Sequence, residues 1–194
     1  MQTRVRVRLM KLAILLGVLL AAVVAIILLL FVQDLIRDPW LTLRSQRVGQ
    51  YAIDYPVGWS VDIFTNGSHG DQEQVALFQQ RLPLRLYPVV VIRRKSFTNP
   101  SLQDVADWGE QRILELYSDP GDQYELLPAE RVTLNGNQVI TRKYTTAIQT
   151  PLPLVRKDAY IVRQSDGFII TLTATQEGFP NAEAIFDHMV STFQ

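Results

Sequence analysis

The first residues to consider for chemistry are the histidines, because the chain has only 2 of them and no cysteine. His69 lies in a glycine-flanked segment with Asp71 and Glu73, so one loop offers an imidazole and two carboxylates. A protein metal site needs about three ligands held in a fixed geometry. Glycines on both sides of His69 do not fix such a geometry, so the pattern favours a mobile turn. We therefore predict no metal and no cofactor.

No catalytic group is expected elsewhere in the chain. The second histidine, His188, lies opposite the apolar stripe of a C-terminal helix, so we expect a solvated side chain. A serine triad needs a histidine within hydrogen-bond reach of a serine and an acid, and no G-x-S-x-G sequence is present. Paired catalytic carboxylates must converge across a substrate. Four acidic residues are instead spaced along one solvated helix face: Asp104, Asp107, Glu110 and Glu115.

Two apolar segments interrupted by proline are better candidates, for binding a protein partner. They are residues 81–88 (RLPLRLYP) and residues 150–155 (TPLPLV). Proline keeps such segments out of central strands, and apolar surface loops often mark contact sites. The alternative is that both loops fold back over the core. The predicted partner-binding residues are Leu82, Leu84, Leu86, Tyr87, Leu152, Leu154 and Val155.

The longest apolar run of the chain is residues 12–32, LAILLGVLLAAVVAIILLLFV, which contains no charged or polar side chain. At about 1.5 Å per residue, a helix of this length spans about 30 Å, the thickness of a bilayer's hydrocarbon core. We predict a transmembrane helix, with the lipid bilayer as its partner. A cleaved signal peptide is the alternative, but its apolar region is usually about 7–15 residues long and ends at a small-x-small site. An uncleaved signal anchor fits the run better.

The charges on either side of this run predict its orientation. Arg4, Arg6, Arg8 and Lys11 precede it, whereas all 19 acidic residues follow it. The positive-inside rule then places residues 1–11 in the cytoplasm and the rest of this single-pass chain outside it. After the run, 15 basic residues stand against 19 acidic ones, a net charge of about −4. Nucleic-acid binding needs a basic surface, so we expect no nucleic-acid partner.

Beyond the run we predict a juxtamembrane linker over residues 33–48 and one domain over residues 49–194. Trp40 in the linker is either an interfacial anchor or a side chain packed on the domain. Period-two alternation and turn sequences predict six to eight antiparallel strands. The strongest hairpin signal is Asn135-Gly136, between strands expected over about residues 124–134 and 138–148, and a second turn is expected at residues 165–167. Apolar residues at helical spacing predict one helix that Asn99 or Ser101 caps and residues 119–122 end, and another helix after Pro180. The buried face expected for the first helix is Leu102, Val105, Gly109, Ile113 and Leu116.

This order of parts resembles the PsbP-like family over residues 49–194. The resemblance is carried by the opening YAIDYPVGWSV, the helix around SLQDVADW, the NG hairpin, and the closing GFIITLTAT with FDHMVSTF. It implies an α-β-α sandwich around an antiparallel sheet. Members of that family include accessory subunits of photosystem II, and a distant relative binds the GTPase Ran. This chain would be a membrane-anchored member, and the resemblance transfers no functional residues to it.

The sequence therefore predicts an α+β domain on a membrane anchor, with an accessory or binding role on a partner protein complex. Two alternatives remain open: an extracytoplasmic hydrolase, and a component of envelope assembly or transport. Scarce histidine and missing catalytic motifs favour binding over hydrolysis. A lone helix without G-x-x-x-G makes self-pairing through that motif less favourable.

Overall fold

The computed structural model of the chain describes residue 17 and residues 19–27, 39–45, 51–64, 73–80, 87–118, 123–147 and 153–194. The chain separates into two compact units, Met1–Pro39 and Trp40–Gln194. In the first unit, residues 19–27 are helical, as predicted for that part of the apolar run. Among the residues that the structure describes, no helical segment has the length and apolar character needed for a membrane crossing.

The second unit contains ten strands and two helices among its described residues. The strands are β1 (Trp40–Ser45), β2 (Tyr51–Pro56), β3 (Trp59–Ile63), β4 (Glu73–Gln80), β5 (Val89–Ser96), β6 (Gln123–Leu126), β7 (Glu130–Leu134), β8 (Asn137–Ala147), β9 (Leu154–Arg163) and β10 (Asp166–Thr175). The helices are α2 (Leu102–Leu116) and α3 (Phe179–Thr192). The predicted α+β class is confirmed.

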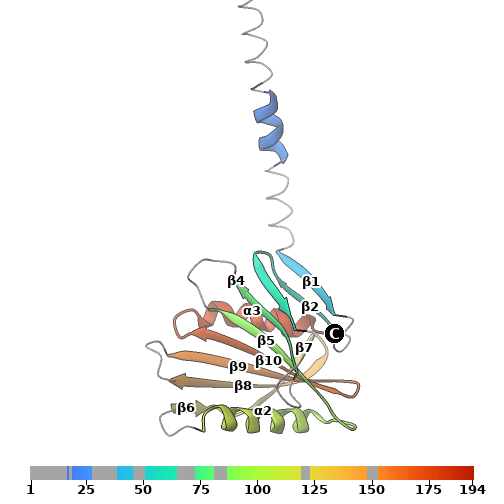
Figure 1. The fold of residues 1–194 in the computed structure, drawn as a ribbon, viewed down its shortest axis with the longest axis vertical. Helices are drawn as coiled ribbons and strands as arrows, with labels where there is room; N and C mark the ends of the chain where they lie inside the picture. Colours follow the sequence, from blue (N-terminus) through green and yellow to red (C-terminus); the bar gives the residue numbers. More distant parts are fainter. Residues whose placement is uncertain are drawn as a thin grey trace, which may run out of the picture. The chain divides into compact units, whose positions relative to one another are not determined.

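Eight of these strands form one antiparallel sheet in the order β3-β4-β5-β10-β9-β8-β6, with β7 also paired to β8 (Figure 1). The remaining two, β1 and β2, form a separate antiparallel pair. The predicted hairpin at Asn135-Gly136 joins β7 to β8, and both residues have a positive φ, of 49° and 82°. Such a turn follows the right-handed twist of the strands, which is why Asn-Gly is favoured there.

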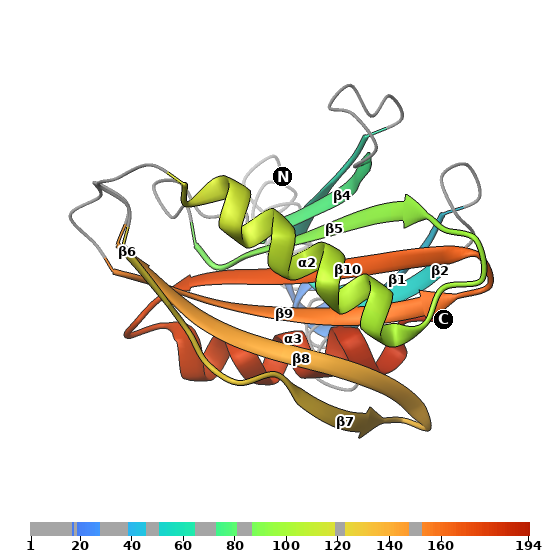
Figure 2. The same cartoon turned by 90° about the horizontal axis from the view of Figure 1, so that it is seen from below.

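The two helices cover opposite faces of the large sheet (Figure 2). Along β10, Phe168 and Ile170 belong to the core on the α3 side, whereas Ile169 between them belongs to the core on the α2 side. This alternation follows from the period of two in a β-strand. The domain is therefore an α-β-α sandwich, as the family resemblance implied.

Several predicted boundaries are wrong for local reasons. The β9–β10 turn is Gln164-Ser165, so Asp166 and Gly167 lie in β10. The strand expected over residues 124–134 divides into β6 and β7, with Pro128 between them because proline cannot donate to a ladder. The cap of α2 is Ser101, whose side chain accepts from the Asp104 N–H in a capping box.

The domain also begins earlier than predicted. Residues 40–45 form β1 instead of a linker, with Trp40 opposite Pro56 and Ser45 opposite Tyr51. Trp40 packs against the α3-side core, so of its two predicted roles the structure supports packing on the domain. The period-two alternation of Leu41 and Leu43 with polar residues was the signal for this strand.

Helix α2 lies very close to the sheet at Gly109. A Cβ atom on Gly109 would stand 2.2 Å from Cε1 of Tyr160 on β9. Helix α2 buries Val105 and Ile113 as predicted, and it also buries Trp108. Leu116, which was assigned to the buried face, is exposed.

We expect Gly109→Ala to destabilise the domain, although alanine favours a helix over glycine by about 1 kcal/mol. The Tyr160 ring is fully buried and has no room to move, and overpacking a core costs about 1–3 kcal/mol. Chemical denaturation of the full chain in detergent measures the change. Gln111→Ala, on the exposed side of α2, is the matched control and should change stability by less than about 0.5 kcal/mol. A stabilised Gly109→Ala variant would contradict the close approach.

Candidate functional site

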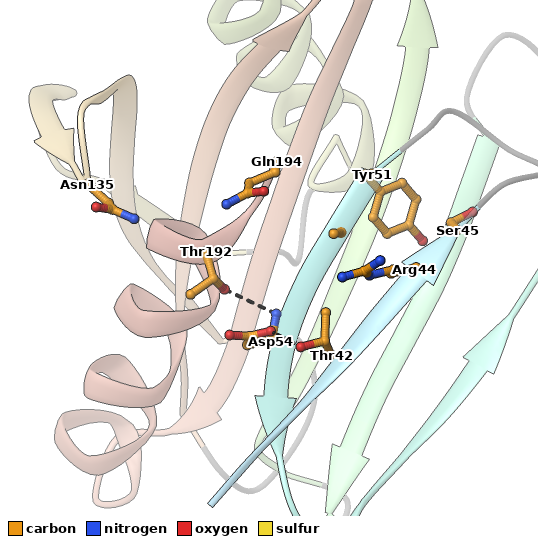
Figure 3. Close-up of a pocket in the computed structure, with 9 residues that line it drawn as sticks. Thr42, Arg44, Ser45, Tyr51, Asp54, Asn135, Thr192 and Gln194 are labelled. Atoms are coloured by element: carbon orange, nitrogen blue, oxygen red, sulfur yellow. Dashed lines mark hydrogen bonds between the residues drawn. The ribbon is translucent and has the colours of Figure 1, made fainter. Parts of the chain in front are cut away.

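An open, mostly polar pocket with a volume of about 910 Å³ lies where β1, β2 and the end of α3 meet (Figure 3). The residues that line it are Thr42, Arg44, Ser45, Tyr51, Ala52, Asp54, Asn135, Thr192 and Gln194. We refer to these residues as the C-terminal pocket.

The pairing of β1 with β2 positions one wall of the C-terminal pocket. In this register Thr42 stands opposite Asp54, and Arg44 stands opposite Ala52. The Thr42 hydroxyl donates to Oδ1 of Asp54 at 2.6 Å, which fixes the carboxylate. Arg44 is exposed, so its guanidinium is available to a ligand.

The last residues of the chain form the opposite wall. The N–H of Gln194 donates to the carbonyl of Ala52 at 3.0 Å, and the N–H of Ala52 donates back at 2.9 Å. The N–H of Asp54 donates to the Thr192 hydroxyl at 3.1 Å. Asn135 donates from its side chain to the Ser191 carbonyl at 3.3 Å, which brings the β7–β8 turn to the same place. Segments distant in sequence are thus joined around one opening.

Tyr51 anchors the pocket to the core. Its ring stacks on Phe193, with centroids 5.4 Å apart, and its hydroxyl oxygen is buried. Burial raises the pKa of Tyr51, and the neighbouring Ser45 hydroxyl offsets part of that rise. The Tyr51 phenol therefore stays protonated at neutral pH.

This set of groups is suited to binding polar ligands. It offers one cation (Arg44), one anion (Asp54), several hydroxyls and two amides, which together supply both donors and acceptors. A nucleophilic mechanism needs a base beside the nucleophile, and the lining contains no histidine or lysine. Among the described residues, no group of three or more His, Cys, Asp or Glu could hold a metal ion.

A second cluster of charges lies between β8, β9 and α3, beside a cavity of about 290 Å³. Nζ of Lys157 lies 2.8 Å from Oε1 of Glu183 and 2.6 Å from Oδ1 of Asp187. Lys143 approaches the same Glu183 oxygen at 2.7 Å. Burial alone would raise the pKa of Glu183, but its hydrogen bonds to Lys143 and Lys157 hold that pKa below the ordinary 4.5. These ion pairs connect α3 to strands β8 and β9 of the sheet.

The lowered pKa of Glu183 predicts a loss of stability in acid. The unfolded chain takes up a proton at this carboxylate near pH 4.5, whereas the folded domain does so only at lower pH. This contribution to the free energy of unfolding is therefore complete above pH 4.5 and is lost as the pH falls through the lower folded value. Denaturation curves between pH 3 and 6 should show a shallower acid dependence for Glu183→Gln. The exposed Glu177→Gln control should behave as wild type, and an unchanged slope in Glu183→Gln would contradict the assignment.

The structure separates the predicted partner-binding residues. Leu82, Leu84, Leu86 and Leu152 lie outside the described residues, and Tyr87 is half-buried just before β5. Leu154 is the first residue of β9 and only 4% exposed, so its assignment to an exposed loop is wrong. Val155 is half-buried against the α3-side core. Both lie in a strand because the chain resumes pairing directly after Pro153.

The histidines also need a correction. His69 lies outside the described residues, so the prediction for its loop stays a prediction. His188 is half-buried instead of solvated, because its ring stacks on Trp40 with centroids 3.7 Å apart. The strand that carries Trp40 was assigned to a linker, which is why this contact was missed.

No family model matches the chain, and no curated protein matches its sequence. Solved structures do match its fold. Cyanobacterial PsbP (CyanoP) from Synechocystis sp. PCC 6803 matches with a TM-score of 0.61 and 16% identity, over 80% of this chain and 92% of that chain. The Ran-binding protein Mog1p of Saccharomyces cerevisiae matches with a TM-score of 0.53 and 12% identity, over 80% of this chain and 94% of that chain. LpqN of Mycobacterium tuberculosis, which is involved in cell envelope biogenesis, matches with a TM-score of 0.51 and 13% identity, over 80% of this chain and 89% of that chain.

These similarities define a class: the chain has the fold shared by PsbP and Mog1p. The family resemblance read from the sequence is confirmed at the level of the fold. At these identities the likeness concerns the fold alone.

Proposed function

We propose that the chain is a membrane-tethered binding module whose domain lies outside the cytoplasm and docks on a protein partner. The observation that carries the proposal is the C-terminal pocket, an open surface rich in hydrogen-bonding groups whose lining contains no histidine or lysine. Exposed Arg44 and fixed Asp54 give this surface a charge of each sign. A partner segment with complementary charges would gain specificity from both.

The likeness to other proteins supports a role in binding. Mog1p is a Ran-binding protein with the same fold, so this architecture is compatible with recognition of a protein partner. LpqN takes part in cell envelope biogenesis, which favours envelope assembly as the second candidate function. In either candidate function, the domain of this chain would act by binding a partner protein.

The membrane tether is supported by the apolar run at residues 12–32 and its basic flank. Four basic residues and no acidic residue precede the run, and this charge distribution favours a cytoplasmic N-terminus. A tether raises the local concentration of the domain near a membrane complex, so weak contacts suffice for docking. The apolar segment with Leu82, Leu84 and Leu86 remains a proposed additional contact.

Protease accessibility tests the location. Protease added to right-side-out vesicles should digest the domain while a fragment containing residues 12–32 stays with the membrane. A protected domain, or a mature N-terminus near residue 33, would contradict the proposed topology.

Photo-crosslinking tests the contact surface. A photoreactive residue introduced at Thr42 in the C-terminal pocket should capture one protein reproducibly from intact membranes. The same residue at Glu177, which is exposed but does not line the pocket, is the matched control. Equal capture from both positions would place the partner elsewhere.

A further inference from the structure

Three arginines gather around one buried carboxylate on the face of the sheet that α2 covers. Arg93 comes from β5, Arg112 from α2 and Arg156 from β9, which also carries Asp158. Asp158 is 1% exposed and Arg112 is 9% exposed. Burial raises the pKa of Asp158, whereas the hydroxyl of Thr171 on β10 and the three guanidinium groups act in the opposite direction. In Figure 2, α2 passes across this part of the sheet.

The charges of this cluster do not balance. Three guanidinium groups face one carboxylate, and in the described part of the chain none of the three forms an ion pair within 4 Å. By contrast, the neighbouring Arg142 does form an ion pair, with its guanidinium 2.9 Å from Oε2 of Glu110. Buried guanidinium groups are costly unless anions or hydrogen bonds compensate them. The excess positive charge therefore indicates a place for an anion.

Buried hydroxyl groups lie at the same place. The hydroxyls of Tyr117 and Thr146 are buried, at 5% and 2% residue exposure, and lie within hydrogen-bonding reach of each other, with no other partner among the described residues. Nε of Arg156 is also buried and has no hydrogen-bond partner in the described part of the chain. The guanidinium of Arg156 lies 5.6 Å from the centroid of the Tyr117 ring, so these donors are neighbours. Native proteins seldom leave several buried polar groups unsatisfied together.

The one acceptor of the cluster is already engaged. The Tyr160 hydroxyl donates to Oδ2 of Asp158 at 3.3 Å, and the Tyr144 hydroxyl donates to Oδ1 at 3.5 Å. Asp158 therefore holds two tyrosines in place and leaves the arginines without a direct partner. What remains at the cluster is a set of guanidinium and hydroxyl groups without a further carboxylate among the groups that act on Asp158.

We propose that Arg112, Arg156, Tyr117 and Thr146, which come from α2 and its C-terminal end and from strands β8 and β9, together bind a small oxyanion. Guanidinium groups present planar forks of N–H donors that match phosphate, sulfate and carboxylate oxygens. The two hydroxyls supply further donors, as in other oxyanion sites. The burial of Thr146 and Tyr117 limits the ligand to a single ion or to one terminal anionic group.

Thermal unfolding of the full chain in detergent, followed by tryptophan fluorescence, provides the first test. The Tm should rise by a few degrees, and saturably, with added sodium phosphate or sulfate, relative to sodium chloride of equal ionic strength. Calorimetric titration with phosphate should give one site per chain. Titration with glycerol phosphate distinguishes a free oxyanion from the anionic group of a larger ligand. Binding of inorganic phosphate but not of glycerol phosphate indicates a free ion. Equal binding of the two compounds indicates the terminal group of a larger ligand.

Matched variants locate the site. Arg156→Gln should weaken phosphate binding at least about tenfold, whereas Arg131→Gln, an exposed arginine on β7, should bind as wild type does. Thr146→Val keeps the shape of the side chain and removes one donor, so it should weaken binding about three- to tenfold even if an arginine variant folds poorly. A wild-type chain whose Tm responds to phosphate no more than to chloride would overturn the proposal. Equal phosphate binding by Arg156→Gln and wild type would overturn it as well.

Discussion

Replacing Asp158 by alanine is expected to lower the free energy of unfolding by about 2–6 kcal/mol, because two buried hydroxyl groups lose their acceptor. The substitution leaves the buried hydroxyls of Tyr144 and Tyr160 without their acceptor. Each unsatisfied hydroxyl costs about 1–3 kcal/mol. It also removes a buried carboxylate whose charge interacts with all three arginines of the cluster. Denaturant unfolding of the full chain measures the loss.

Asp158→Asn separates the hydrogen bonds from the charge. The amide oxygen still accepts from one tyrosine, so we expect a smaller loss than with alanine. If alanine and asparagine are both within about 0.5 kcal/mol of wild type, the carboxylate does not organise this face of the sheet. Added phosphate should restore part of the stability of Asp158→Ala, since an anion would then replace the missing negative charge.

Replacing Trp59 by alanine is expected to cost about 3–5 kcal/mol, the usual cost of truncating a large aromatic side chain in a core. Trp59 is buried in the α3-side core at the start of β3, directly after the turn at Gly58. Phe78 and Phe186 belong to the same core and are fully buried.

Trp40→Ala is the internal comparison, because Trp40 is only half-buried against the same core. We expect it to lose less stability than Trp59→Ala. The reverse order would show that β1 contributes more to the core than β3 does. Urea denaturation measures the free energy of unfolding of both variants. Equal m-values for the two variants make their losses of stability directly comparable.

Much of the fold could be predicted because local chemistry and long-range packing agree. The Asn135-Gly136 turn fixes one hairpin through its backbone geometry alone. The stripe of Phe186, Met189 and Val190 on α3 is buried as its spacing predicts. In these places a single segment carries enough information to specify its own structure.

The candidate site could not be predicted in the same way. The C-terminal pocket joins Thr42, Asp54 and Gln194, which come from β1, β2 and the end of the chain. No local pattern indicates that Ala52 exchanges hydrogen bonds with Gln194. The pocket therefore appears only when the pairing of distant segments is known.

The arginine cluster was missed for a related reason. Asp158 lies in a strand whose two faces are both covered, so a charged residue there was a signal of a buried polar partner. Its partners come from α2, β5, β8 and β10, and their register depends on the order of strands in the sheet. A sequence reading without that order could detect the anomaly but could not assemble the site.

The most direct test of the account is the amount of partner protein that co-purifies with the full chain from solubilised membranes. Arg44→Glu reverses the exposed positive charge of the C-terminal pocket and should lower recovery of the partner at least about tenfold, with the domain still folded. Arg131→Glu makes the same change of charge on β7, away from the pocket, and should recover as much partner as wild type does. Equal recovery by Arg44→Glu and Arg131→Glu would contradict the claim that this pocket holds the partner.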